Sequence, residues 1–184
     1  MSRRLFLLAT LLLCGFTLSG CGYNQMQSNE EAVFAAWADV EASYQRRADL
    51  IPNLVETVKG YASHERETLE AVVQARNVAM AAGGPQEQAQ AENMISGALK
   101  SIFALSEAYP DLKANQNFLN LQEELTSSED RIAYARQFYN DTVQRYNTKT
   151  QTFPSVVLAN MFKFNQREYF EAEGEATGPV RVQF

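Results

Sequence analysis

The stretch FLNLQEELTSSEDRIAYARQFYNDTVQRY, residues 118–146, decides the fold class of this chain. Its apolar and small residues recur at alternating steps of three and four, which places them on one face of an α-helix. These residues are Phe118, Leu121, Leu125, Ser128, Ile132, Ala135, Tyr139, Thr142 and Tyr146. Such a helix cannot bury its stripe alone, so the pattern predicts partner helices with stripes of their own.

Three further segments carry apolar stripes at helical spacing, and period-2 alternation is rare. The first stripe is Val33, Trp37, Val40 and Tyr44; the second is Ile51, Val55, Val58, Ala62, Leu69, Val72 and Ala79; the third, less regular, is Met94, Ala98, Phe103 and Leu105. We therefore predict an all-α fold, a four-helix bundle with long helices. A short C-terminal helix is expected near residues 155–162.

Proline and glycine mark the breaks between the predicted helices. Gly83-Gly84-Pro85 is expected to end the second helix and start the third. Tyr109-Pro110-Asp111 is expected to end the third helix, with Asp111 as the N-cap of the fourth. Phe153-Pro154 is expected to end the fourth helix.

The first break is open to two interpretations. Residues 46–65 read RRADLIPNLVETVKGYASHE. Asp49 is a good N-cap and Pro52 is tolerated in a first turn, so we expect a tight hairpin between Arg47 and Leu50. The alternative is one long helix kinked at Pro52, because the heptad phase continues unbroken from Val33 to Val58.

The first 20 residues, MSRRLFLLATLLLCGFTLSG, have the pattern of a signal peptide. Two arginines precede an apolar run from Leu5 to Leu18, which spans ~21 Å as a helix, less than the ~30 Å hydrocarbon core of a bilayer. The sequence Leu18-Ser19-Gly20-Cys21 resembles a bacterial lipobox, which implies lipid attachment to Cys21 and cleavage before it. The alternative is an uncleaved signal anchor that contains a cysteine.

Either anchor would place the domain on the outer side of the inner membrane, because the positive end stays cytoplasmic. Gly22 follows the cysteine, where lipoproteins retained at the inner membrane carry aspartate. In a Gram-negative host we therefore expect the outer membrane, with the domain facing the periplasm. Palmitate and other acyl chains together would hold the protein stably, which one chain alone would not.

Composition excludes several classes of protein. The net charge is −6, and without Arg3 and Arg4 the chain from Cys21 keeps 14 of its 16 basic residues against 22 acidic ones, or −8. This is not the basic footprint of a nucleic-acid binder. Both cysteines, Cys14 and Cys21, precede the folded domain, which removes disulfides and thiol chemistry.

Four segments identify the chain as similar to the LemA family. They are CGYN (21–24), AAWADVEASYQRRADLIPNLVETVKGYASHE (35–65), EAYPDLKANQNFLNLQEEL (107–125) and RIAYARQFYNDTVQRYNTKTQTFP (131–154), followed by PVRVQF at the end. The resemblance implies an up-and-down antiparallel four-helix bundle attached to a bacterial membrane at its N-terminus, and it does not imply an enzyme. The expected domains are a signal peptide at 1–20, a LemA-like bundle at 21–165, and a flexible acidic tail at 166–184.

Candidate catalytic and metal sites are weak. A ferritin-type di-iron site needs Glu-x-x-His on two helices, but the chain has one histidine, His64, preceded at three residues by Tyr61. His64-Glu65 begins a zinc motif that Thr68 does not complete. No Gly-x-Ser-x-Gly exists, and carboxylate pairs are uninformative in an acidic chain. We predict no metal, no cofactor and no catalysis.

Two groups of residues are candidates for a binding surface or for structural bracing. The first is a corner formed by Arg46, Arg47, Asp49, Pro52, Asn53, Lys59, Tyr61 and His64; the second is a loop formed by Tyr109, Pro110, Lys113, Asn115 and Asn117. In the structural interpretation, Arg47 pairs with Asp49, Glu56 or the Glu123–Glu124 pair, while Arg46 extends into solvent. In the functional one, a guanidinium binds an anionic headgroup, carboxylate or glycan. We favour the structural interpretation.

Two functions fit these patterns. The first is a membrane-tethered interaction or scaffold module with an envelope protein as partner and a monomeric soluble domain. The second is a lipoprotein that binds a lipid, peptide or cell-wall fragment in a groove between helices. Continuous packing would favour the first function and a polar cleft the second.

Overall fold

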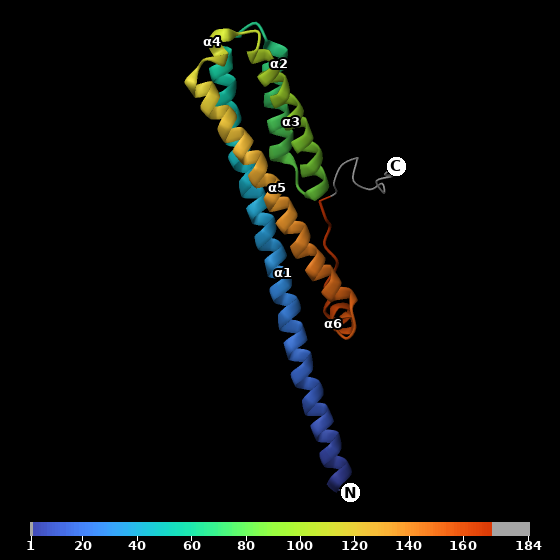
Figure 1. Ribbon diagram of the computed structural model, residues 1–184. Helices are drawn as coiled ribbons and strands as arrows, with labels where there is room; N and C mark the ends of the chain where they lie inside the picture. The colour runs from blue at the N-terminus through green and yellow to red at the C-terminus, as the bar shows by residue number, and fades with distance from the viewer. Residues whose placement is uncertain (1, 171–184) are drawn as a thin grey trace, which may run out of the picture. The chain divides into compact units, whose positions relative to one another are not determined.

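The computed structural model describes residues 2–170, with side chains from Gly22 onward. Within this range the chain forms six helices and no strand: α1 (Ser2–Lys59), α2 (Arg66–Ala81), α3 (Pro85–Ser106), α4 (Pro110–Lys113), α5 (Gln116–Gln151) and α6 (Ser155–Phe162) (Figure 1). The all-α prediction is confirmed, and α6 coincides with the short helix expected at 155–162. None of the helices searched in the described part combines the length and apolar character of a membrane span.

The described residues form two compact units, and each of the two longest helices contributes to both. Unit 1 comprises residues 2–39 and 137–168, and unit 2 comprises residues 40–136 with 169 and 170. Unit 1 therefore holds the first part of α1, the end of α5, and α6. Unit 2 holds the rest of α1, helices α2 to α4, and the start of α5.

The expected hairpin at residues 47–50 is wrong, because α1 continues through Pro52 to Lys59. Asp49 caps nothing there and instead accepts a hydrogen bond from Gln45 Nε2, one helical turn earlier, at 2.8 Å. Proline has no N–H, so the Ala48 carbonyl loses its usual helical donor. Arg76 of α2 replaces that donor, with Nε 2.8 Å from the Ala48 oxygen. The chain turns instead at residues 60–65.

The core of unit 2 is built from apolar stripes of all five helices that enter it. Its members are Ile51, Leu54, Val58, Ala62, Leu69, Val72, Ala75, Ala79, Ala91, Ile95, Leu99, Ile102, Leu112, Phe118 and Leu125. The stripes predicted in α1, α2 and α5 are buried or half-buried. The stripe predicted for α3 is wrong at Met94, which is 50% exposed, because the buried face runs through Ile95, Leu99 and Ile102.

The predicted helix breaks at 83–85 and 153–154 have the expected positions, and the N-cap of the long helix α5 differs from the prediction. Pro85 starts α3, and the Glu87 carboxylate accepts a hydrogen bond from the Gly83 N–H at 3.0 Å. Asp111 does not cap the long helix, because it lies inside the short helix α4. Asn115 caps α5 instead, where its Oδ1 accepts a hydrogen bond from the Phe118 N–H at 3.0 Å.

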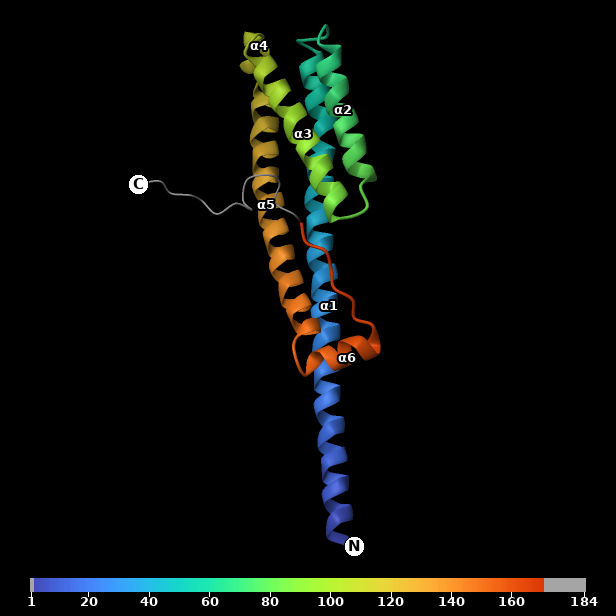
Figure 2. The same cartoon turned by 90° about the vertical axis from the view of Figure 1, so that its right-hand side faces the viewer.

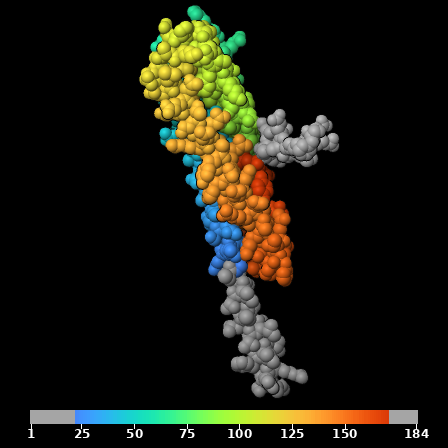
Figure 3. Space-filling model, viewed as in Figure 1, coloured from blue at the N-terminus to red at the C-terminus, as the bar shows by residue number. Residues whose placement is uncertain are grey.

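In unit 1, α6 crosses α1 and the chain then returns along it (Figure 2). The buried amide of Asn147 on α5 fixes this return, donating to the Arg167 carbonyl at 2.8 Å and accepting from the Arg167 N–H at 2.9 Å. Tyr139 Oη donates to the Glu168 carbonyl at 3.0 Å. Residues 167 and 168, placed with the expected tail, therefore contact α5; residues 171–184 of that tail lie outside the described residues. Figure 3 shows α6 and the end of α5 at the surface, in orange.

Candidate functional site

A cluster of charged side chains is buried in the helical core of unit 2. Arg47 of α1 is only 2% exposed and forms an ion pair with Glu92 of α3, which is 5% exposed. Arg47 Nη2 also donates to Ser96 Oγ at 3.3 Å and lies 3.9 Å from Glu129 Oε2 of α5. The Arg47 guanidinium thus joins α1, α3 and α5. Its pairing with carboxylates offsets the free-energy cost of burying its charge.

The cluster is incompletely hydrogen-bonded. Within the described part of the chain, Arg47 Nε, Tyr44 Oη and both Glu92 carboxylate oxygens are buried without a hydrogen-bond partner, although the ion pair joins Arg47 to Glu92. Burial lowers the pKa of Arg47, while the charge of Glu129 and the nearby Tyr44 act in the opposite direction. Arginine nevertheless stays protonated at neutral pH. Buried polar groups without hydrogen bonds are unusual in proteins, and here the ion pair offsets part of the cost of burial.

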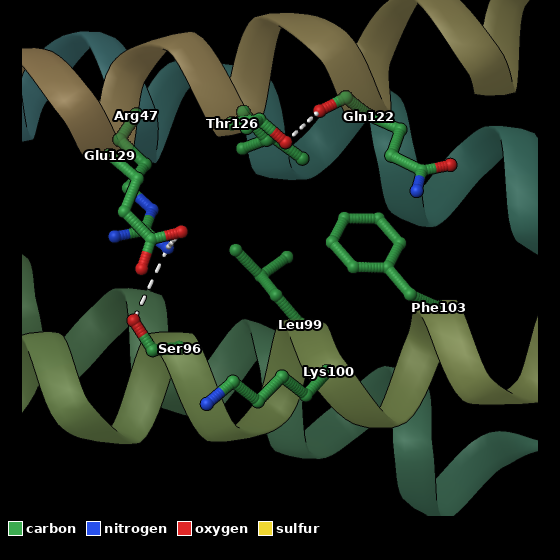
Figure 4. A pocket seen from close by; sticks show the side chains of 9 residues that line it. Arg47, Ser96, Leu99, Lys100, Phe103, Gln122, Thr126 and Glu129 are labelled. Carbon is green, nitrogen blue, oxygen red and sulfur yellow. Dashed lines mark hydrogen bonds and ion pairs between the residues drawn. The ribbon is translucent and has the colours of Figure 1, made fainter.

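The cluster opens into a cavity of about 190 Å³ between α3 and α5. Leu99, Phe103 and Leu125 supply its apolar surface; Arg47, Ser96, Lys100, Gln122, Thr126 and Glu129 supply polar groups. In Figure 4, Arg47 and Glu129 lie at one end, with Phe103 and Gln122 at the other. Leu99 points into the space between the helices. The cavity therefore has a mixed lining, in which apolar side chains lie beside polar side chains and charges of both signs.

The predicted corner around residues 46–65 divides into separate places. Arg47 pairs with acids, as the structural interpretation expected, and Arg46 is exposed. The predicted acids are wrong, because Arg47 contacts Glu92 and Glu129 and not Asp49, Glu56 or the Glu123–Glu124 pair. Pro52 is exposed within α1, away from this cavity's lining.

The rest of the corner meets the predicted loop at one end of unit 2. Tyr61 Oη accepts a hydrogen bond from Asn115 Nδ2 at 2.8 Å, joining the α1–α2 turn to the start of α5. Tyr109 Oη donates to Glu65 Oε1 at 3.1 Å, and this hydrogen bond raises the pKa of Tyr109. Tyr61 belongs to the predicted corner and Tyr109 and Asn115 to the predicted loop, and the fold brings these segments together.

The remaining predicted residues lie on the surface of unit 2. Asn53 and Asn117 line a shallow depression of about 280 Å³ with Thr57, Asn120, Leu121 and Glu124. Lys59 pairs with Glu56 at 3.7 Å, and Lys113 with Glu107 at 2.6 Å. Pro110 begins α4, and His64 is exposed in the α1–α2 turn. The side chain of Cys21 lies outside the described residues.

Sequence reasoning missed Glu92, although a signal was present. Glu92, Ile95, Leu99 and Ile102 follow one another at steps of three, four and three, so a carboxylate lies on the buried stripe of α3. Gln88, four residues earlier, is buried on the same stripe. In the part of the chain described, no group of three or more His, Cys, Asp or Glu side chains is placed to hold a metal ion.

Comparison with known protein sequences identifies a family and several relatives that this chain resembles. The sequence model of the LemA family matches residues 36–184. The chain is 27% identical over 172 residues to Protein LemA of Metamycoplasma hominis, covering 91% of this chain and 77% of that protein. It is 26% identical over 184 positions to Magnetosome protein MamQ 2 of Paramagnetospirillum magneticum and 25% identical to Magnetosome protein MamQ of Magnetospirillum gryphiswaldense, each covering 86% of this chain and 68% of the relative.

Proposed function

Because the chain belongs to the LemA family, we propose that it is a membrane-tethered interaction module of the cell envelope, without catalytic activity of its own. Its helical units present a partner-binding surface, and its N-terminus holds that surface at a membrane. The cavity between α3 and α5 is the point where a partner protein engages.

The cavity beside the buried Arg47 carries this proposal. At about 190 Å³ it is smaller than the roughly 300–1,000 Å³ of pockets for drug-sized ligands, so it accommodates one large side chain and not a lipid or glycan. Its apolar surface of Leu99, Phe103 and Leu125 suits an apolar anchor residue. Lys100 and Glu129 at its edge provide polar contacts around such an anchor, an arrangement typical of interface hot spots.

The second candidate, a lipoprotein that binds a small ligand, has less support. A larger depression of about 590 Å³ is lined by Leu119, Gln122, Glu123, Thr126, Ser127 and Asp130. All six belong to α5, so this depression is an open helix face and not a groove between helices. Ligand sites are concave and enclose most of the ligand surface.

The tether is proposed at Cys21 on the sequence Leu18-Ser19-Gly20-Cys21. Relatives named as magnetosome proteins support a membrane location, since a magnetosome is a membrane compartment. The proposed position is the outer side of the inner membrane or, in a Gram-negative host, the periplasmic face of the outer membrane. Cells fed a palmitate analogue should label the wild type and not Cys21→Ala. Labelled Cys21→Ala protein would exclude this tether.

A photo-crosslinking amino acid at Lys100, at the cavity edge, tests the partner site in intact cells. Glu70, exposed on α2 and outside the cavity lining, is the matched control position. We expect one protein species captured from position 100 and absent from position 70. The second variant, Thr126→Trp, fills the cavity from an exposed position and should abolish that capture while the far-UV circular dichroism stays unchanged. Capture of lipid or glycan at position 100 would favour the second candidate.

A further inference from the structure

Helix α6 exposes large apolar side chains along one face. Val157 is 54% exposed and Met161 is 66% exposed, and Phe153, two residues before the helix, is 84% exposed. Val157 and Met161 are four residues apart within α6, which places them in one row on the helix. Phe162 is 51% exposed beside them. The sequence of α6, SVVLANMF, contains no charged residue to interrupt this surface.

The packing of α6 leaves much of its large apolar surface outside the core. Its buried residues are the small Ser155 and Ala159, Val156 and Leu158 are partly buried, and Val157 and Met161 are exposed. A helix that served only the core would bury its large apolar side chains and expose its small ones. A contiguous apolar surface of this kind marks an interaction site with another protein or a membrane.

The position of α6 on α1 indicates whether its exposed apolar surface contacts another protein or a membrane. The Phe162 ring packs edge-on against Tyr23 at a centroid distance of 4.8 Å, and Phe164 lies 5.7 Å from the same ring. Leu158 Cδ1 lies only 3.0 Å from the position that a Cβ on Gly22 would occupy, so α6 uses the missing side chain to approach α1 closely. Gly22 directly follows Cys21 in the sequence.

The direction of α6 also fits a membrane surface. Figures 1 and 2 show α6 nearly end-on and then lengthwise across α1, so it runs across that helix and not along it. With α1 along the bilayer normal, a helix that crosses α1 lies parallel to the membrane surface. With eight residues, α6 is about 12 Å long and cannot span a ~30 Å hydrocarbon core.

We propose that α6 is an interfacial membrane-contact element, with the exposed side chains of Phe153, Val157 and Met161 inserted at the headgroup boundary of the membrane that holds the tether. This inference rests on the proposed tether at Cys21. Lys149 in the last turn of α5 and Lys163 directly after α6 flank α6 in the sequence, and such cations suit anionic headgroups. The tether raises the local concentration of bilayer at α6, so a short helix suffices.

Site-specific fluorescence on the mature, lipid-modified full chain tests the proposal. In that protein the Cys21 sulfur is alkylated, so a single added cysteine takes an environment-sensitive label. One variant is Met161→Cys; its control is Ala38→Cys, exposed in the same unit, 16 residues from Gly22 and hence about 24 Å along α1. Each is reconstituted in phosphatidylethanolamine and phosphatidylglycerol vesicles that carry a nitroxide-labelled lipid.

The expected result is a blue shift and strong lipid quenching of the label at 161, with neither at 38. An unquenched label at 161 on protein that still floats with the vesicles would overturn the membrane contact and leave the tether intact. A blue shift without lipid quenching would assign another protein surface to α6 and would also overturn it. Protein that does not float would overturn the tether and the inference together.

A charge variant supplies the second measurement. Val157→Asp introduces a carboxylate into the exposed row without disturbing the core, and it should remove most of the quenching of the label at 161. Asn160→Asp adds the same charge at an exposed position of the same helix, outside the row, and should keep it. Equal quenching in both variants would overturn the proposal.

Discussion

Each unit contains an arginine–glutamate pair, and the two pairs differ in almost every physical respect. In unit 2, the Arg47 and Glu92 side chains are 3% and 6% exposed, and several of their polar atoms have no hydrogen-bond partner among the described residues. In unit 1, Arg167 Nη2 lies 2.7 Å from Glu30 Oε1, with side chains 37% and 17% exposed. Tyr146 Oη donates to the same Glu30 oxygen at 3.3 Å, and the Arg167 guanidinium lies over the Phe34 ring.

The pKa values of the two arginines move in opposite directions. Burial lowers the pKa of Arg47, whereas the hydrogen bond to Glu30 raises the pKa of Arg167. Burial therefore dominates the first pair and the hydrogen bond the second. The same two residue types thus fix the register of three helices in unit 2 and fasten a returning chain in unit 1. Burying an ion pair costs desolvation free energy but favours one specific packing of the helices. A half-exposed ion pair costs little desolvation and contributes little to the free energy of unfolding.

The largest expected effect comes from removing one partner of the buried pair. Arg47→Ala leaves Glu92 buried without its cation and should lower the free energy of unfolding by about 3–5 kcal/mol. Arg47→Met combined with Glu92→Leu removes both charges at similar volume and should recover most of that loss. Urea melts followed by circular dichroism measure both variants. A loss below about 1 kcal/mol for Arg47→Ala would show that Arg47 does not brace the helices.

A second, smaller effect tests whether Arg76 compensates for Pro52. Arg76→Ala removes the donor to the Ala48 carbonyl and should cost about 1–3 kcal/mol. In a Pro52→Ala background the new N–H bonds that carbonyl, so the same substitution should cost less. A double-mutant cycle by urea unfolding measures the coupling. Equal costs in the two backgrounds would mean that the hydrogen bond seen at Ala48 is energetically irrelevant.

Breaking the half-exposed Arg167–Glu30 pair of unit 1 should change the free energy of unfolding only weakly. Arg167→Ala is expected to cost about 0–1 kcal/mol, and added salt should shrink that cost further. Asn147→Ala is the matched comparison, because it removes two hydrogen bonds to the backbone of the same residue and should cost about 1–3 kcal/mol. Thermal melts at low and high salt separate the two. If Arg167→Ala were the more damaging variant, the ion pair and not the amide would fasten the chain.

The smallest effect at neutral pH is expected for Tyr44→Phe, since the Tyr44 hydroxyl is buried and unpaired among the described residues. Burial raises the pKa of Tyr44 above its ordinary value of 10.0, although Arg136 and Arg47 oppose this. The folded state thus keeps the phenol neutral where the unfolded chain ionises it. Its contribution is complete below pH 10 and is lost as the pH rises toward the folded pKa.

The measurement is stability against pH for the wild type and Tyr44→Phe. Above pH 10 the wild type should lose more stability than the variant, because only the wild type carries this ionisable group at position 44. Parallel pH profiles would show that Tyr44 is accessible to water in the folded state. Tyr139 and Tyr146, whose pKa values are also raised by burial, remain in both proteins and cancel in the comparison.

Local pattern determined the elements of this protein. The stripe from Phe118 to Tyr146 is buried or half-buried as predicted, and the glycines and prolines at 83–85 and 153–154 mark breaks in the helices. These features depend on side-chain periodicity and on the missing N–H and fixed φ of proline, which act within a few residues. The sequence therefore specified an all-α chain and the helix breaks at 83–85 and 153–154.

Tertiary structure decided what the local pattern left open. Whether Pro52 ends a helix depends on a donor from another helix, and Arg76, 28 residues away, satisfies the freed Ala48 carbonyl. The partner of Arg47 is likewise Glu92, because only packing determines which carboxylate faces a buried guanidinium. The same holds for Tyr61 and Asn115, 54 residues apart and hydrogen-bonded. Periodicity determines which residues share one face of a helix. The burial and pairing energies of the folded units determine which residues of other helices that face contacts.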